Sequence, residues 1–254
     1  MKQRPYILTI AGFDPSSGAG LTADIKTFEA LRCYGLSVCT ANTVQNDISF
    51  SKCYWTPVEI IKEQIDILFD RFKIDVVKIG IVENWSVLNM ILNVIKTKNA
   101  SCKIVLDPVL KSSTAFDFHE ESSKKTFEES FDEILKKIYL ITPNYQEIQN
   151  LYQDKSIEET IIHIQSKTNL FLKGGHKTEK IGVDELYTQE GKRFALKPKR
   201  NSYYEKHGSG CVLSSAIASY IALKYPLLKS CYKGKRYVET ILSSNKTLLG
   251  YHNY

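Results

Sequence analysis

Short apolar segments alternate with helical patterns along most of this 254-residue chain, and this alternation limits the folds open to it. Strands are predicted at residues 6–11, 36–43, 76–79, 103–106, 139–141 and 169–172. Helices are predicted at residues 21–34, 58–72, 86–98 and 212–221. Such a β-α order favours a mostly parallel sheet with helices on both faces, followed here by a hairpin of residues 183–187 and 193–196.

The chain is expected to form a single domain over residues 1–254, because no linker, charge block or internal repeat divides it. Residues 116–133 are the most polar stretch and predict a surface loop that leads into an amphipathic helix. The six cysteines lack zinc-ligand spacing, and no segment resembles a signal peptide or a membrane span. We therefore expect a cytoplasmic protein with reduced thiols and no membrane partner.

The formal net charge of +6 is modest, and the lysines are dispersed apart from a basic stretch between Lys224 and Arg236. A charge distribution of this kind suits a small anionic ligand better than a nucleic acid. We expect no nucleic-acid partner.

A glycine-rich segment precedes the apolar run of residues 212–221 and reads His207-Gly208-Ser209-Gly210-Cys211. Glycines at a helix start let the backbone approach a ligand, and the unpaired N–H groups there attract anions. The segment thus predicts a phosphate site, although its spacing matches neither common nucleotide-binding fingerprint. Cys211 would lie in the first turn, where the helix dipole lowers the pKa of a thiol, and it is a candidate base. A glycine turn that caps a structural helix with a buried cysteine explains the segment equally well.

Polar or glycine residues follow most of the predicted strands: Gly12, Asp14, Gln45, Gly80, Asp107, Asn144 and Lys173 to Gly175. Ligands bind outside the carboxyl ends of the strands in open parallel sheets, so these residues are expected to line one rim.

A kinase needs an anion site, carboxylates for magnesium and a base for the acceptor hydroxyl. The glycine-rich segment can supply the anion site, Glu147 and Asp107 the carboxylates, and Lys173 a phosphate contact. Each has a structural alternative. Glu147 can be a first-turn acid of a helix capped by Asn144, Asp107 a turn residue, and Lys173 a solvated side chain. His207 can be a loop histidine with no role beyond a hydrogen bond.

Asp24 and Gln45 form a second predicted group near the ends of the first two strands. A carboxylate at Asp24 can accept two hydrogen bonds from an amino-substituted heterocycle or an alcohol, and Gln45 offers both a donor and an acceptor. A capped helix and a polar loop would explain one of these residues but not the pair.

The ordered motifs resemble the hydroxymethylpyrimidine and phosphomethylpyrimidine kinases of thiamine biosynthesis, in the ribokinase-like superfamily. The resemblance covers almost the whole chain. It rests on LTIAGFDPSSGAG (8–20), ADIKTF (23–28), TVQN (43–46), VKIG (77–80), LDPV (106–109), LITPN (140–144) with Glu147, KGGH (173–176) and HGSGC (207–211).

The resemblance implies a three-layer α/β sandwich that uses ATP and Mg²⁺ to phosphorylate 4-amino-5-hydroxymethyl-2-methylpyrimidine and, in many members, its monophosphate. It implies a substrate site of Gly12, Asp14, Ala19, Asp24, Gln45, Ile81 and Val109. It implies ATP binding by Asn144, Lys173, Gly175, His207, Gly208 and Gly210, and magnesium at Glu147 with Asp107. Catalysis would fall to Cys211, Gly208, Ser209 and Gly210, with Cys211 in the place where most of the superfamily has aspartate.

The chain departs from the family pattern at a few places. Ser209 replaces the usual threonine, Ile81 replaces methionine, and Phe13 stands where a small polar residue is common. Residues 224–254 extend past the usual end as a basic, tyrosine-rich segment that we expect to pack on the domain surface.

Two other functions remain open from the sequence. The first is a pyridoxine, pyridoxal or pyridoxamine kinase, because these substrates are also hydroxymethyl-bearing heterocycles. The second is a non-catalytic sensor that binds the pyrimidine. The resemblance also suggests a homodimer, and it leaves the second phosphorylation open.

Overall fold

The computed structural model describes residues 3–109, 124–152, 154–175 and 182–252. In this part of the chain, one sheet takes in nine strands in the order β3-β2-β1-β4-β5-β6-β7-β8-β9. The strands are β1 (Tyr6–Phe13), β2 (Tyr34–Gln45), β3 (Phe50–Trp55), β4 (Ile74–Ile79), β5 (Lys103–Leu106), β6 (Leu140–Ile141), β7 (Asn169–Leu172), β8 (Asp184–Tyr187) and β9 (Arg193–Leu196). The run from β2 to β7 is parallel, while β3, β8 and β9 pair antiparallel. The predicted parallel sheet and the late hairpin are confirmed.

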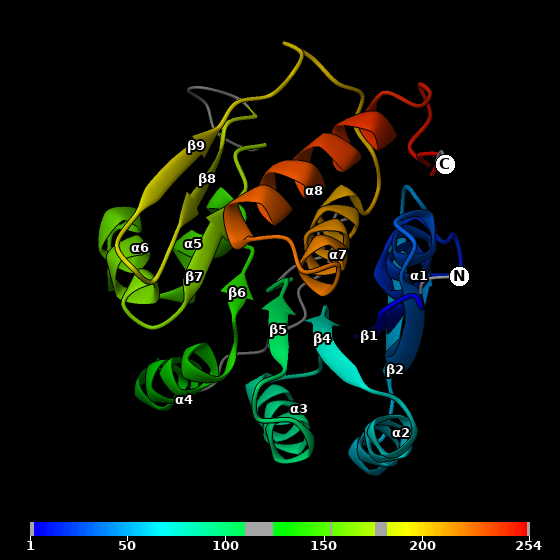
Figure 1. Cartoon of the computed structure of the whole chain (residues 1–254), viewed down its shortest axis with the longest axis vertical. Helices are drawn as coiled ribbons and strands as arrows, with labels where there is room; N and C mark the ends of the chain where they lie inside the picture. Colours follow the sequence, from blue (N-terminus) through cyan, green and yellow to red (C-terminus); the bar gives the residue numbers. More distant parts are fainter. Residues whose placement is uncertain (1–2, 110–123, 153, 176–181, 253–254) are drawn as a thin grey trace.

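Helices cover both faces of the sheet, which gives the three-layer sandwich (Figure 1). One face carries α2 (Val58–Arg71), α3 (Trp85–Lys98), α4 (Lys124–Lys137), α5 (Tyr145–Leu151) and α6 (Ile157–Gln165). The other carries α1 (Gly20–Ala30), α7 (Ser209–Ala222) and α8 (Leu227–Leu242). No helix in the described parts of the chain is long and apolar enough to cross a bilayer.

Alternate residues of the central strands enter two separate cores. In β5, Ile104 and Leu106 pack in the core under α2 to α6, while Val105 packs in the core under α1, α7 and α8. Strands buried on both faces need apolar residues at every position, which explains the continuous apolar runs in the sequence.

The edge strand β3 was not predicted from the sequence. Its residues Phe50–Trp55 alternate between half-buried and exposed positions and pair only with β2. A strand with one exposed face and one free edge needs no apolar run, so it lacks the signal that the central strands give.

The predicted helix of residues 21–34 is too long. It ends at Ala30, because Arg32 adopts a left-handed conformation with φ 61° and Tyr34 already begins β2. The predicted amphipathic helix after the polar stretch is confirmed as α4, in which Phe131, Ile134 and Leu135 are buried. The loop predicted before it falls in residues 110–123, outside the described residues.

Residues 224–254 form part of the core as well as of the surface. The helix α8 packs against α7 and buries Cys231, Val238 and Ile241. At Gly234 the two helices come so close that a Cβ atom would lie 2.6 Å from Cγ1 of Ile217. The expectation of simple surface packing therefore understates the role of this segment.

Candidate functional site

The carboxyl ends of the parallel strands bring polar residues to one rim, opposite the start of α7, as the sequence predicts. Asp107 follows β5, Asn144 follows β6 and Lys173 follows β7. A Cβ atom built on Gly210 would lie 3.3 Å from Lys173 Nζ and 3.9 Å from Asp107 Oδ2. The glycine-rich segment thus lies directly against the charged residues of the rim.

Gly208 begins α7 in a conformation that suits glycine. It is the N-cap residue with φ 71°, and a Cβ atom there would lie 2.1 Å from the carbonyl oxygen of Gly18. The predicted helix start is confirmed, and the loop after β1 packs against it without room for a side chain. The Ser209 N–H donates to the carbonyl oxygen of Lys206 at 3.4 Å, so the first-turn N–H groups of Gly210 and Cys211 are the ones that suit an anion.

Asp14 and His207 are a buried pair that joins these two loops. The Asp14 carboxylate accepts hydrogen bonds from the amides of Ser16, Gly18 and Ala19 at 2.8, 3.1 and 2.8 Å. His207 Nε2 lies 2.9 Å from Asp14 Oδ2, and the two side chains are 2% and 0% exposed. Burial alone would raise the pKa of Asp14, but the hydrogen bonds from His207, Ser16 and Ala19 outweigh it and lower the pKa.

This pair bears on two predictions. The side chains of Asp14 and His207 are enclosed by the loops that they connect, and the contacts of Asp14 with a substrate and of His207 with a nucleotide stay predictions. The Asp14 carboxylate also holds the segment of residues 14–19 through the amides of Gly18 and Ala19.

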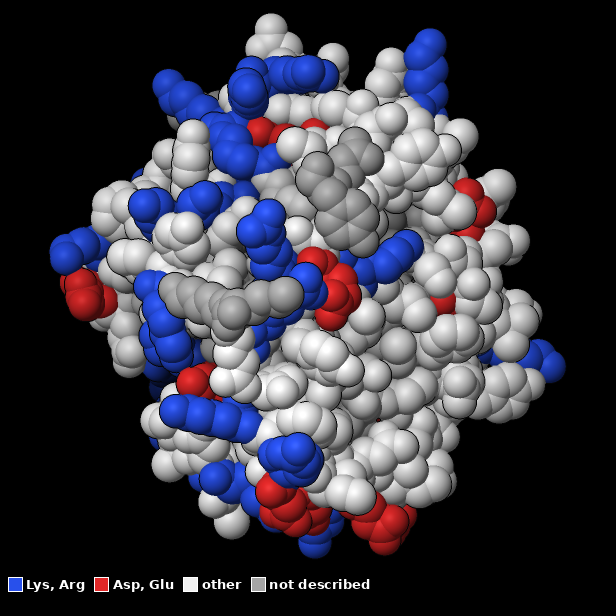
Figure 2. Space-filling view, turned by 45° about the vertical axis from the view of Figure 1, so that its right-hand side comes forward, with Lys and Arg blue, Asp and Glu red and all other residues white. Residues whose placement is uncertain are grey.

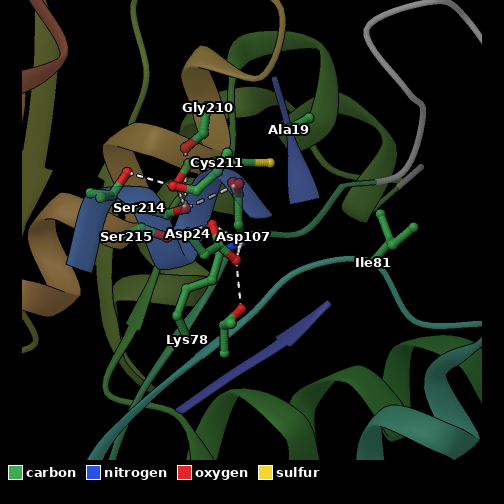
Figure 3. A network of polar contacts seen from close by, with 12 residues as sticks. Ala19, Asp24, Lys78, Ile81, Asp107, Gly210, Cys211, Ser214 and Ser215 are labelled. Atoms are coloured by element: carbon green, nitrogen blue, oxygen red, sulfur yellow. Dashed lines mark hydrogen bonds and ion pairs between the residues drawn. The ribbon is translucent and has the colours of Figure 1, made fainter. Parts of the chain in front are cut away.

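Cys211 lies in the first turn of α7, as predicted, but its pKa moves in the opposite direction to the prediction. Burial raises the pKa of the thiol to about 11, Lys78 lowers it in part, and the carboxylates of Asp107 and Asp24 raise it again. The expected depression by the helix dipole is outweighed by desolvation of the thiolate. Figure 3 shows the sulfur directed towards the side of the site where Ala19 and Ile81 lie.

Asp24 lies in a buried network of polar side chains, and its predicted contact with a substrate stays a prediction. Lys78 Nζ lies 3.1 and 2.8 Å from its two carboxylate oxygens. The hydroxyls of Thr9 and Ser215 donate to it at 2.5 and 2.6 Å, and the Asp24 and Lys78 side chains are both 0% exposed. Burial would lower the pKa of Lys78, but Asp24, Cys211 and Asp107 outweigh it and raise the pKa.

A second charged cluster surrounds Lys173. Its Nζ lies 2.9 Å from Asp107 Oδ1 and 3.5 Å from Glu147 Oε2. Thr142 and Ser214 also donate to Asp107, at 3.1 and 3.2 Å. The Lys173 side chain is 13% exposed, and its ammonium group is held between two carboxylates beside Gly210.

The pKa values in this cluster follow from burial and the shared lysine. Burial would raise the pKa of Asp107, but Lys173 and Lys78 outweigh it and lower the pKa. Burial raises the pKa of Glu147, Lys173 opposes the rise, and Asp107 adds to it. Burial would lower the pKa of Lys173, but Asp107 and Glu147 outweigh it and raise the pKa.

Asn144 and Glu147 also form a capping box at the start of α5. Asn144 Oδ1 accepts from the amides of Gln146 and Glu147 at 2.9 and 2.8 Å, and Glu147 Oε2 accepts from the Asn144 amide at 2.6 Å. The structural alternative for these two residues is therefore confirmed.

This donor set limits how a magnesium ion can be held. Mg²⁺ takes one or two carboxylates and completes its shell with waters and phosphate oxygens. The contacts of Glu147 to Asn144 and Lys173 both use Oε2, so Oε1 can face a hydrated ion. The Asp107 carboxylate already accepts hydrogen bonds from Lys173, Thr142 and Ser214. It is therefore better suited to hold the Lys173 ammonium in place than to bind a metal directly.

The other predicted substrate residues lie at or just after the carboxyl ends of β1, β2, β4 and β5. A Cβ atom on Gly12 would lie 2.5 Å from Cδ1 of Ile81. Gln45 is half-buried at the end of β2, and its Nε2 donates to Thr43 Oγ1 at 2.8 Å, which leaves its oxygen to accept from a ligand. Val109 is half-buried next to Asp107. Contacts of these residues and of Ala19 with a substrate stay predictions.

The predicted ATP contact at Gly175 also stays a prediction. Gly175 is exposed, and an added Cβ atom there would meet no atom within 4 Å. The neighbouring residues 176–181 lie outside the described part of the chain.

The sequence analysis did not predict the buried residues that bond to Asp24 and Asp107. These are Thr9, Lys78, Thr142, Ser214 and Ser215, all fully buried. A lysine inside the apolar strand Val76–Ile79 and two serines inside the apolar helix α7 were the available signal, because buried polar groups must find partners.

Comparison with known proteins relates the whole chain to one group of enzymes. A family described as phosphomethylpyrimidine kinase matches residues 14–254, which includes the C-terminal segment. The hydroxymethylpyrimidine/phosphomethylpyrimidine kinase of Aquifex aeolicus is 35% identical, with 96% of this chain and 97% of that protein aligned. The bifunctional thiamine biosynthesis protein ThiDN of Methanocaldococcus jannaschii is 31% identical, and the chain spans 55% of its length.

Solved structures agree on the fold. A phosphomethylpyrimidine kinase from Clostridium difficile superposes with a TM-score of 0.77 at 31% identity, covering 92% of this chain and 98% of that chain. A pyridoxal kinase from Staphylococcus aureus, in complex with AMP-PCP, gives a TM-score of 0.80 at 23% identity, covering 95% and 89%. At that identity the second likeness concerns the fold alone.

Proposed function

The chain belongs to the phosphomethylpyrimidine kinase family, and from this premise we propose that it is an ATP-dependent kinase of thiamine biosynthesis. Its substrate is 4-amino-5-hydroxymethyl-2-methylpyrimidine, whose hydroxymethyl oxygen receives the γ-phosphoryl group of ATP. The resulting monophosphate is phosphorylated a second time to the diphosphate. The observation that carries this proposal is the anion site at the start of α7, where Lys173 Nζ lies against Gly210 and the next residue is Cys211.

The first turn of α7 holds the phosphoryl group during transfer. The N–H groups of Gly210 and Cys211 in this turn would donate to the transferring oxygens, and the Lys173 ammonium would balance their negative charge. These groups are fixed before substrates bind, because Gly208 packs on Gly18 and Lys173 on Asp107. Phosphoryl transfer depends mainly on such positioning and charge balance.

Cys211 takes the proton of the acceptor hydroxyl. As the hydroxymethyl oxygen bonds to phosphorus, the bond from phosphorus to the bridging oxygen of ADP breaks, and the hydroxyl proton passes to the Cys211 thiolate. With a pKa of about 11, roughly one thiol in 10⁴ is ionised at pH 7. A loose transition state requires little proton transfer from the attacking hydroxyl, so the reaction tolerates a base that is ionised in so small a fraction of molecules.

A magnesium ion bound with ATP would supply positive charge that stabilises the phosphate oxygens. Glu147 is proposed to hold the ion through water, and Asp107 to act through Lys173. Gly12, Ala19, Gln45, Ile81 and Val109 are proposed to line the pyrimidine side.

The proposal extends to the setting of the enzyme. Residues 1–254 are proposed to act as one domain in the cytoplasm, as a homodimer, with small molecules and neither nucleic acid nor membrane as partners. The six free cysteines support a reducing compartment. Figure 2 shows Lys and Arg side chains in separate groups with Asp and Glu between them, a distribution that favours small anions over nucleic acid.

A product analysis tests the proposal. The purified protein is incubated with Mg²⁺, ATP and either the hydroxymethylpyrimidine or pyridoxine, and mono- and diphosphate products are separated. We expect the pyrimidine monophosphate to form first and the diphosphate after it. The variant Cys211→Ala serves as the control, and we expect it to form either product only slowly. Transfer to pyridoxine alone, or to neither compound, would overturn the proposal in favour of a vitamin B6 kinase or a sensor.

A further inference from the structure

Two adjacent serines of α7 bind two different buried carboxylates. Ser215 Oγ donates to Asp24 Oδ1 at 2.6 Å. Ser214 Oγ lies 3.2 Å from Asp107 Oδ2, and it shares its single proton between this carboxylate and the carbonyl oxygens of Gly210 and Cys211 in its own helix, each at 3.1 Å. These serines lie one helical turn after Gly210 and Cys211, on the same side of the helix (Figure 3). These contacts therefore fix the position of α7 relative to the sheet, one helical turn after the residues of the anion site.

The Asp24 carboxylate joins four elements at one point. It comes from α1 and accepts from Thr9 of β1, Lys78 of β4 and Ser215 of α7. All four side chains are fully buried. A buried ion pair is weak evidence for stability, since apolar residues of similar volume often serve as well, but it holds a defined geometry.

We propose that Asp24, Lys78 and Ser215 are positioning residues of the phosphoryl-transfer site. They hold the first turn of α7 in place, so that its N–H groups and Cys211 meet the reacting atoms without themselves touching a substrate. The inference rests on the proposed function for the reaction concerned. It gives Asp24 a role other than the substrate contact that the family resemblance implies.

Three possible roles predict different kinetics for a variant. Loss of a positioning residue lowers kcat and leaves the KM for the pyrimidine nearly unchanged, because a small misplacement of catalytic groups slows the reaction strongly. Loss of a substrate contact raises KM. Loss of a purely structural residue lowers the melting temperature and leaves both constants unchanged for the folded protein.

Ser215→Ala is the first test, with Ser219→Ala as its matched control. Both serines are fully buried in α7 one turn apart, but the Ser219 hydroxyl donates to the carbonyl oxygen of Ser215, within its own helix, at 2.8 Å. We expect kcat to fall about tenfold in Ser215→Ala at unchanged KM. Ser219→Ala is expected to keep both constants within about twofold. Equal kcat values in the two variants would overturn the inference.

Asp24→Asn separates positioning from substrate contact. We expect a lower kcat with little change in the KM for the pyrimidine. A large rise in KM at unchanged kcat would return Asp24 to the substrate site and overturn the inference. If this variant does not fold, because Lys78 is left buried without a counter-charge, the two serine variants still decide the question.

Hydrogen exchange tests the inference without any substrate. Amides of residues 208–216 are expected to exchange faster in Ser215→Ala than in the wild type or in Ser219→Ala, because the start of α7 loses its tie to the sheet. Equal exchange in the two variants would count against the inference. A wild-type protein that transfers no phosphate would instead contradict the proposed function alone.

Discussion

Burial decides the protonation state of Cys211. The thiol lies at the start of a helix, where the dipole favours a thiolate, but it is also enclosed near Asp24 and Asp107, and its pKa rises to about 11. Lys78 lowers the pKa only in part. A base of this kind becomes more active as the pH rises.

The pH dependence of turnover is therefore predicted to differ between cysteine and aspartate at this position. In the wild type the thiolate fraction grows about tenfold per pH unit below pH 11, so kcat/KM for the pyrimidine should rise from pH 7 to 9. In Cys211→Asp the carboxylate is already ionised at pH 7, and the profile should be flat over that range. Steady-state assays across pH check this, and parallel profiles for the two proteins would show that Cys211 is not the base.

The sequence predicted single residues well where local backbone geometry decides their role. It predicted them poorly where the role depends on a contact with a residue far away in the chain. The glycines at 208 and 210 and the first-turn position of Cys211 follow from local sequence, and the structure confirms them. Asp14 and Asp24 read as rim carboxylates in the sequence, but distant residues, His207 and Lys78, enclose them. Pairings across 193 and 54 residues leave no local pattern.

At the scale of elements, the start of α7 depends on the loop after β1. Gly208 has both a positive φ and no space for a side chain, whereas Gly191 in the β8–β9 turn has φ 84° and open space around it. Both glycines thus adopt a positive φ, but only Gly208 packs against the Gly18 carbonyl oxygen.

Gly208→Ala is predicted to abolish most turnover and to lower the melting temperature. The new Cβ atom would lie 2.1 Å from the Gly18 carbonyl oxygen, which forces the two loops apart. Gly191→Ala, with the strain of a positive φ alone, should lower stability by about 1 kcal/mol and leave kcat unchanged. Thermal unfolding and kinetics of both variants check this; full activity in Gly208→Ala would show that the loops need not interlock.

Elements were predicted reliably in the interior of the sheet and less well at its edges. The strands β5 and β7 match their predicted bounds, since both are continuous apolar runs. The edge strand β3 and the helix α6 gave weaker signals, because one face of each meets water.

At the scale of the whole molecule, the C-terminal segment completes the layer that carries the site. The helix α8 covers α7 and contributes Cys231, Val238 and Ile241 to the core shared with α1. The basic, tyrosine-rich composition of this segment concealed its role, because two of its charged residues, Lys235 and Glu239, are buried in ion pairs while others lie on the outer face of α8. Lys229, Lys233 and Arg236 there lie over the rings of neighbouring tyrosines.

Removal of residues 224–254 is predicted to prevent folding. The deletion would expose the α7 residues that α8 covers, including Ile217, and would remove several buried side chains at a loss of roughly 2 kcal/mol or more each. Circular dichroism and thermal unfolding of the truncated chain check this. A truncated protein with a cooperative transition near that of the full chain would show that the segment is an addition to a complete fold.

The central claim concerns the choice of substrate, and a comparison of kcat/KM for the hydroxymethylpyrimidine and for pyridoxine tests it most directly. Both compounds offer a hydroxymethyl group on a nitrogen heterocycle, so the difference in kcat/KM reports how the site binds the ring, for which Gln45 and Ile81 are the proposed contacts. We predict that kcat/KM is at least about 100-fold higher for the pyrimidine, since a site built for one set of hydrogen bonds rejects another. Equal values, or a preference for pyridoxine, would contradict the account.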